Sequence, residues 1–165
     1  MSAHGELLLE VVFPGEPVGK GRPRVALHGG KARAYTPAKT KAWEAHAGLV
    51  LKDHLRVHPE LRDALLGSGP LAVEIEAVKA RRRADKGRGR IVRTVKPDLD
   101  NVIKIVLDAV VKAGVITDDA LVARLEASQW HAAVGEGAHT RLRIRTLREA
   151  EWIPLNFYQE PTLGF

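Results

Sequence analysis

The chain has 165 residues and no cysteine, which excludes disulfide bonds and thiolate metal ligands. Its length suits one domain, and a composition that is 45% hydrophobic and 28% charged is that of a globular protein. The formal net charge of +6 favours polyanionic partners, because contacts with phosphates release condensed counterions.

The chain begins MSAHGELLLEVVFPGE, without a basic segment or a long apolar run. We therefore expect neither a signal peptide nor a membrane span, and a cytoplasmic location. Residues 6–13 predict a first strand, which Pro14 and Gly15 end. Gly29-Gly30 is typical of a two-residue hairpin turn, and we expect its strands at 24–28 and 31–35.

A helix is expected from Pro37 to about Leu55, with Thr36 as the N-cap. Its apolar side chains recur on one face: Trp43, Ala47, Val50, Leu51 and Leu55. Pro59 and the segment Gly67-Ser68-Gly69-Pro70 then break the chain. In residues 71–78 apolar side chains alternate with glutamates, which predicts a half-buried strand.

The stretch from Lys79 to Lys96 is strongly basic and contains one acid, Asp85. Its cations are Lys79, Arg81, Arg82, Arg83, Lys86, Arg88, Arg90, Arg93 and Lys96. Glycine and alanine interrupt the run, so we expect a mobile basic loop. On its own such a run is a solvated loop; its position directly before an acidic motif favours a role in holding phosphates.

Apolar residues spaced by three and four predict a second helix over 100–113, stopped by Gly114. Two strands are expected at 121–133 and 139–147, as a terminal hairpin. The order of elements indicates an α+β (mixed α/β) domain over residues 1–148, with a mixed β-sheet and two main helices on one face. Residues 149–165 form a tail that packs on the body or on a second copy, or is disordered.

The centre of the chain reads PDLDNVIK. In an extended Asp98-Leu99-Asp100 step both carboxylates point the same way, and the following helix places its positive end beside them. Lys104 lies one helical turn after Asp100. Carboxylate oxygens without thiolate or imidazole ligands are the set that Mg²⁺ or Mn²⁺ prefers.

A second acidic pair, Asp118-Asp119, follows Gly114. If the chain turns back sharply here, three or four carboxylates converge, enough for one or two divalent ions. Each residue also has a simpler interpretation. Asp98 or Asp100 is a helix N-cap, the second pair forms a turn or caps a short helical turn, and Lys104 is a solvated residue that pairs with Asp108. The combination, directly after a basic loop, is much harder to explain by these simpler roles than any one residue is, and favours a divalent metal site.

The segment PDLDNVIKIVLDAVVKAGVITDDALV resembles the central signature of the RusA family of Holliday-junction resolvases. The resemblance lies in the paired aspartates with Asn101, in Lys104 and Asp108, and in the DDA element at 118–120. The segments GKGRPRV and YTP…WE (Tyr35 to Glu44) are similar to the branch of that family found in phages and prophages. The likeness spans roughly residues 10–148 and covers neither the tail after residue 148 nor the length of the arginine-rich loop.

This resemblance implies a two-fold homodimer that requires Mg²⁺, with Mn²⁺ able to substitute, and that places paired nicks in four-way DNA junctions. It implies catalytic roles for Asp98, Asp100, Asp119 and Lys104, with Asp118 supporting the three aspartates as metal ligands. The product would carry a ligatable 5′-phosphate. DNA contacts are expected from Lys20, Arg22 and Arg24 and from the nine cations between Lys79 and Lys96.

We expect hydrolysis assisted by the metal, with Lys104 offsetting charge at phosphorus. None of the seven histidines lies near the acidic residues in the sequence, so no histidine base is assigned. Two other functions stay open: a metal-dependent nuclease of other branched or single-stranded nucleic acids, and a catalytically silent junction-binding protein.

Overall fold

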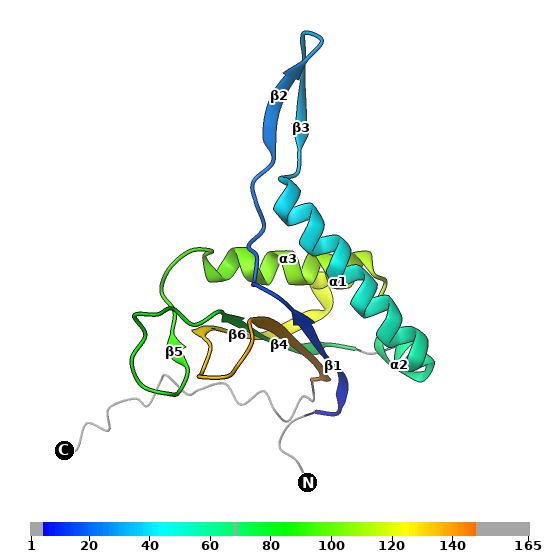
Figure 1. Ribbon diagram of the computed structural model, residues 1–165. Coiled ribbons are helices and arrows are strands. Elements are labelled where there is room, and N and C mark those ends of the chain that lie inside the picture. Colours follow the sequence, from blue (N-terminus) through cyan, green and yellow to red (C-terminus); the bar gives the residue numbers. More distant parts are fainter. Residues whose placement is uncertain (1–4, 68, 148–165) are drawn as a thin grey trace, which may run out of the picture.

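The computed structural model describes residues 5–67 and 69–147, which form a five-stranded mixed sheet, a separate hairpin and three α-helices (Figure 1). In chain order the elements are β1 (Leu7–Pro14), β2 (Arg24–His28), β3 (Lys31–Tyr35), α1 (Ala38–Val57), α2 (Pro59–Leu66), β4 (Leu71–Lys79), β5 (Ile91–Val92), α3 (Leu99–Lys112), the 3₁₀ turn η1 (Asp119–Leu121), β6 (Val122–His131) and β7 (His139–Thr146). The predicted class, a single α+β domain with a mixed sheet, is confirmed.

The helices cover one face of the sheet, as Figure 1 shows. Trp43, Ala47 and Leu51 of α1 are buried, at the spacing that the sequence predicts. From α3 the core receives Val102, Ile105, Val106, Ala109 and Val110. These side chains pack on the alternate residues of the strands that point toward the helices. The position of α3 is therefore set by an apolar face that runs along most of its length.

The strand order is β1-β7-β4-β6-β5, which corrects the predicted terminal hairpin. β6 and β7 follow one another in the chain but do not pair, because β4 lies between them, parallel to β6 and antiparallel to β7. β4 buries one face of alternating side chains, and its backbone N–H and C=O groups are paired on both edges, with β6 and with β7. The segment 132–138 is long enough to cross over it.

Two helix boundaries differ from prediction. α1 begins at Ala38 with Pro37 in the N-cap position, and no side chain caps it, so Thr36 is not the cap. Pro59, expected only to break the chain, is the first residue of a further helix, α2. Proline is well suited to a first helical position, where its missing N–H costs no hydrogen bond.

The predicted hairpin is confirmed residue for residue as β2–β3, and it extends away from the body of the molecule (Figure 1). Gly29 and Gly30 both have positive φ, +57° and +77°, as the tight hairpin turn requires. We call residues 24–35 the arm.

Among the helices of the described residues, none is both long enough and apolar enough to cross a membrane. The predicted tail, 149–165, lies outside the part of the chain that the structure describes.

Candidate functional site

Asp98 and Asp100 lie at the start of α3. The helix begins at Leu99, so only Asp98 is extended, and the predicted extended Asp98-Leu99-Asp100 step is wrong by one residue. Asp98 occupies the N-cap position, yet its side chain makes no capping hydrogen bond. Both carboxylates are exposed, and within the described residues neither has an ion-pair partner; Asp100 has only a 3.5 Å contact from the side-chain amide of Asn101. Their oxygens are therefore available to a ligand.

Lys104 is exposed and lies one turn after Asp100 on α3. It forms no ion pair in the described part of the chain. In particular it does not pair with Asp108, whose carboxylate instead binds Lys20 at 2.6 Å. The first turns of α3 thus present two carboxylates and one ammonium group to solvent.

The second acidic pair lies at η1, between α3 and β6. Asp118 caps this turn: its Oδ1 accepts a hydrogen bond from the backbone N–H of Ala120 at 2.7 Å. The simpler interpretation of Asp118 as a cap therefore holds in the structure. Asp119 is exposed, and its side chain has no hydrogen-bond or ion-pair partner among the described residues.

The three aspartates do not form one group in a single copy. Within residues 5–67 and 69–147, no three His, Cys, Asp or Glu side chains are arranged to hold a metal ion. Arg93 links Pro97, next to Asp98, with Gln129 near the end of β6, whereas Asp119 precedes the start of that strand. Gln129 lies seven residues along β6 from the start of that strand at Val122, so Asp119 lies roughly 20 Å from Asp98. The donor chemistry suits Mg²⁺, but one copy supplies an incomplete set.

Lys20 belongs to an ion-pair network that joins three segments. Its ammonium group contacts Asp108 of α3 and Glu44 of α1, and Glu44 also binds Lys112 at 2.7 Å. Burial disfavours the charge on Lys20, but the hydrogen bonds to Asp108 and Glu44 outweigh it, so its pKa is raised. Lys20 is therefore engaged within the protein and is not free to hold a phosphate in this conformation.

Gly19, next to Lys20, lies directly against the acidic motif. A Cβ at this position would stand 2.7 Å from Cβ of Pro97 and 3.1 Å from Cβ of Asn101. The backbone N–H of Lys20 also donates to the carbonyl of Asn101 at 2.8 Å. We call residues 19–23, which lead into the arm, its root. The root and the start of α3 are thus held together.

We call residues 79–96 the arginine loop; it contains β5, and several of its arginines are bound within the protein, which the sequence did not predict. The guanidinium group of Arg81 donates to backbone carbonyls in the middle of the loop and to one beyond it. The acceptors are the carbonyl oxygens of Asp85, Lys86, Gly87, Gly89 and Ala132, four of them at 3.1 Å. Arginine is suited to this task because its five donors spread from one rigid plane.

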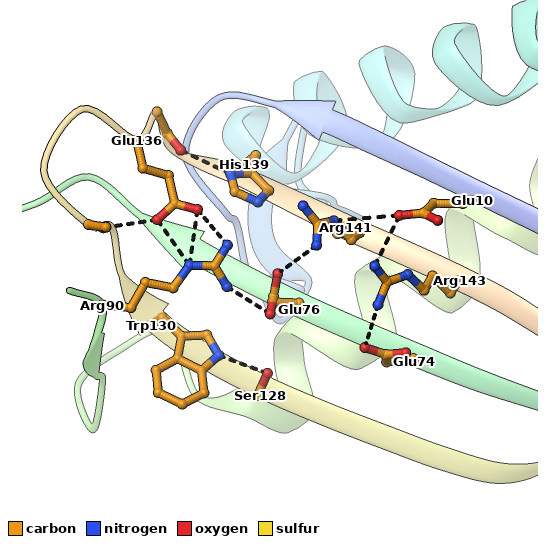
Figure 2. A network of polar contacts seen from close by, with 12 residues as sticks. Glu10, Glu74, Glu76, Arg90, Ser128, Trp130, Glu136, His139, Arg141 and Arg143 are labelled. Atoms are coloured by element: carbon orange, nitrogen blue, oxygen red, sulfur yellow. Dashed lines mark hydrogen bonds and ion pairs between the residues drawn. The ribbon is translucent and has the colours of Figure 1, made fainter.

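Arg82 and Arg90 pair with acids of the same protein. Arg82 contacts Asp85, and the backbone N–H of Arg82, together with its guanidinium group, holds the pKa of that carboxyl below its usual range. Arg90 bridges Glu136 and Glu76 on the sheet face away from the helices, beside further Arg–Glu pairs (Figure 2). Hydrogen bonds from Arg90 lower the pKa of Glu136 to about 2. On this face of the sheet, the positive charges of the arginines are therefore balanced by carboxylates of the same protein.

Arg93 is the most deeply buried cation of the loop, with 3% of the residue exposed. Its Nη1 donates to Oε1 of Gln129 at 2.7 Å and lies 3.5 Å from the carbonyl oxygen of Pro97. Nε and Nη2 have no partner in the described residues, and burial lowers the pKa of Arg93. Arg93 therefore lies in the interior, where it supports the segment that leads to Asp98, and it does not face solvent.

Five of the twelve predicted DNA contacts, Lys20, Arg81, Arg82, Arg90 and Arg93, are thus engaged by the protein itself. The other seven form no ion pair within the described residues: Arg22, Arg24, Lys79, Arg83, Lys86, Arg88 and Lys96. All of these except Lys79 are exposed. The available cations are therefore those of the arm and its root and of the outer side of the arginine loop.

Sequence reasoning missed the internal role of the arginine loop. One local signal was present, since Asp85 stands three residues after Arg82. Three further partners, Ala132, Glu136 and Gln129, are 36 to 51 residues distant in the chain from the arginines that they contact. Such pairs can be found only once the strand order is known.

Comparison with known proteins gives two matches. The family model described as "Endodeoxyribonuclease RusA" matches residues 14–145, from the end of β1 to within β7. A protein of Bacillus subtilis (strain 168), named "Uncharacterized protein YqaN", is 29% identical over 127 residues, which cover 72% of this chain and 84% of that protein. The family match includes the arm, the arginine loop and both acidic pairs.

Proposed function

Because this chain belongs to the endodeoxyribonuclease RusA family, we propose that it is a Mg²⁺-dependent resolvase of four-way (Holliday) DNA junctions that acts as a homodimer. The observation that carries the proposal is the pair of unpaired carboxylates at the start of α3, followed by Lys104. Two nearby acids, Asp108 of α3 and Glu44 of α1, are neutralised by lysines. Asp98 and Asp100 are not, as expected of residues that bind a cation.

A metal site shared between two copies is consistent with the separation of the aspartates. One copy offers Asp98 and Asp100 at one end of α3 and Asp119 roughly 20 Å away. In a two-fold dimer, any contact from the first copy to the second is repeated from the second to the first. A dimer that places Asp119 of one copy beside Asp98 and Asp100 of the other therefore completes two equal sites. A four-way junction is itself two-fold symmetric, which suits two sites acting on opposing strands.

The chain's own residues would divide the work. Asp98, Asp100 and Asp119 would hold the metal, and bound Mg²⁺ supplies a Lewis acid for phosphodiester hydrolysis. Lys104, one turn along the same helix, would place its ammonium group against charge that develops on the phosphate oxygens. Asp118 supports Asp119 by holding the backbone of η1.

The first test replaces Asp100 with asparagine. Asp100→Asn should abolish Mg²⁺-dependent nicking of a synthetic four-way junction and leave junction binding intact, because it removes a ligand without changing the basic surface. Asp63→Asn, at an exposed aspartate of α2 that has no ion pair in the described residues, is the matched control. Nicking by Asp100→Asn at the rate of the control would refute the assignment.

Mixing two inactive variants tests the shared site. In a heterodimer of Asp100→Asn and Asp119→Asn, a site built from two copies leaves one of the two sites with all its carboxylates. A site built within one copy leaves none. Recovery of single-strand nicking after the two proteins are mixed and re-equilibrated is the expected result; no recovery, with heterodimers shown to form, would contradict the shared site.

Substrate choice is tested separately. Nicking of four-way, flap, linear duplex and single-stranded DNA is compared in Mg²⁺, Mn²⁺ and EDTA. Preference for the junction supports a resolvase, preference for another substrate indicates a different nuclease, and binding without nicking indicates a silent binding protein.

A further inference from the structure

The arm stands apart from the rest of the described structure. Its two strands contact each other extensively, and neither makes comparable contact with another element. Every residue of β3 is exposed. A lone two-stranded hairpin is marginally stable in water, so contact with a partner would stabilise the arm.

The pairing register gives the arm two different faces. Val25 pairs with Ala34 and Leu27 with Ala32, and cross-strand partners lie on the same side of a hairpin. This apolar face is open to solvent: Val25 is 70% exposed and Leu27 79%. Large side chains exposed together in this way mark an interaction surface.

The opposite face is basic. It carries Arg24, Lys31 and Arg33, with Tyr35 opposite Arg24. The whole segment from residue 17 to residue 43 contains seven Lys and Arg residues and no Asp or Glu. This charge distribution is complementary to phosphate and would repel a second copy of the same arm.

A linear DNA duplex can contact only the basic face of a hairpin of this kind. A two-stranded ribbon fits a DNA groove, where its cations reach phosphates, but its apolar side then gains nothing. A branch point adds the flat faces of base pairs at the ends of helical segments, and apolar side chains such as leucine are used to wedge against base steps. A ribbon that is basic on one side and apolar on the other therefore fits a branch.

We propose that the arm recognises the branch point of DNA, its basic face on phosphates and its apolar face against the exposed bases. This inference rests on the proposed function and specifies which surface selects the junction. Each strand of the arm has five residues, so the arm spans about 17 Å, enough to reach from the body into the centre of a junction.

The test measures binding in EDTA, so that nothing is cut, to a four-way junction and to a linear duplex made of the same arm sequences. For Val25→Ser/Leu27→Ser, junction affinity should fall at least about tenfold while duplex affinity stays unchanged. A 2-aminopurine base beside the branch point should brighten when the wild type binds, because the base unstacks, and this signal should be lost in the variant.

Two further variants separate the contributions of the faces. Arg24→Ala/Lys31→Ala/Arg33→Ala should weaken junction and duplex binding together and reduce the salt dependence by roughly two to three phosphate contacts. Leu49→Ser, at a leucine of α1 that is 69% exposed, is the control for adding a polar group and should change neither affinity. Within the described residues the two strands of the arm pack mainly on each other, so we expect the melting temperature of all these variants to match the wild type.

The proposal is overturned if the serine variant keeps the wild-type ratio of junction to duplex affinity. It is also overturned if that variant turns a dimer into a monomer in sedimentation, since the arm would then bind a second copy. Failure of the proposed function has a different signature: the wild type would nick no substrate in Mg²⁺ or Mn²⁺, while junction selectivity could still be measured in EDTA.

Discussion

The arm and the arginine loop are both basic and glycine-containing in sequence, yet four arginines of the loop are bound within the protein whereas the cations of the arm are not. In the arginine loop Arg81 binds backbone carbonyls, Arg82 and Arg90 bind carboxylates, and Arg93 is buried. In the arm the cations face solvent and have no acidic neighbour along the chain. A run of arginines therefore predicts a DNA surface only where the chain has not already provided acceptors for them.

The arm and the arginine loop also differ in the contacts that hold them in place. Contacts from β4, β6 and the segment before β7 order the arginine loop, whereas the arm depends on its own ladder of hydrogen bonds. Substitutions of the bound arginines of the loop should therefore change stability, and substitutions in the arm should change binding. Three experiments test this division, from the largest expected effect to the smallest.

Arg81→Ala should cause the largest loss of stability, about 3 kcal/mol, because five backbone carbonyls, two of them buried or half-buried, lose a charged donor at once. Arg81→Lys should recover little, since an ammonium group cannot reach acceptors on both sides of the loop. Urea denaturation measures both. Arg83→Ala, at an exposed arginine two residues away, is the control and should change the free energy of unfolding by less than about 0.5 kcal/mol. Equal effects of Arg81→Ala and Arg83→Ala would show that the loop is not held by Arg81.

Glu136→Gln should destabilise the protein at pH 7 by about 1.5 kcal/mol, since it weakens hydrogen bonds with a charged partner, Arg90. The pKa of Glu136 in the folded protein is about 2, below its ordinary value of 4.5. Its contribution is therefore complete above about pH 4.5 and is lost as the pH falls toward 2. Urea denaturation at pH 7 and pH 2.5 should show the difference between variant and wild type shrinking; a constant difference would contradict the ion pair.

Arg33→Ala in the arm should leave the free energy of unfolding unchanged and lower the slope of log affinity against log salt by about 0.9, the value for one phosphate contact. Arg82→Ala in the arginine loop is the matched comparison, since Arg82 already has Asp85 as a partner. We expect its salt slope to match the wild type. If Arg82→Ala lowers the slope as much as Arg33→Ala, the two regions contact DNA alike.

The local parts of the fold were predictable because their signals are periodic. The alternation in β4, the spacing of three and four in α3 and the Gly-Gly turn of the arm each depend on neighbouring residues. The position of β4 between β6 and β7 was not predictable, because strand pairing depends on residues far apart in the chain.

The candidate site divides in the same way. The placement of Asp98, Asp100 and Lys104 at the start of α3 follows from a motif of seven residues, and the structure has them there within one residue. The distance to Asp119 depends on the direction of β6, which no short motif encodes. Which arginines face solvent depends on acceptors from other strands, so cation counting could not separate Arg83 from Arg81.

The pairing of β1 with β7 bears on the synthesis of the protein. β1 lies at an edge of the sheet, and its neighbour, β7, is the last strand of the described residues. During translation both acidic pairs leave the ribosome before Thr146, while β1 still lacks its partner and β4 lacks one of its two. The sheet closes only when β7 has been made, because non-local strand pairs form late. Truncated chains that end before β7 therefore contain both acidic pairs but lack the strand that joins β1 to β4.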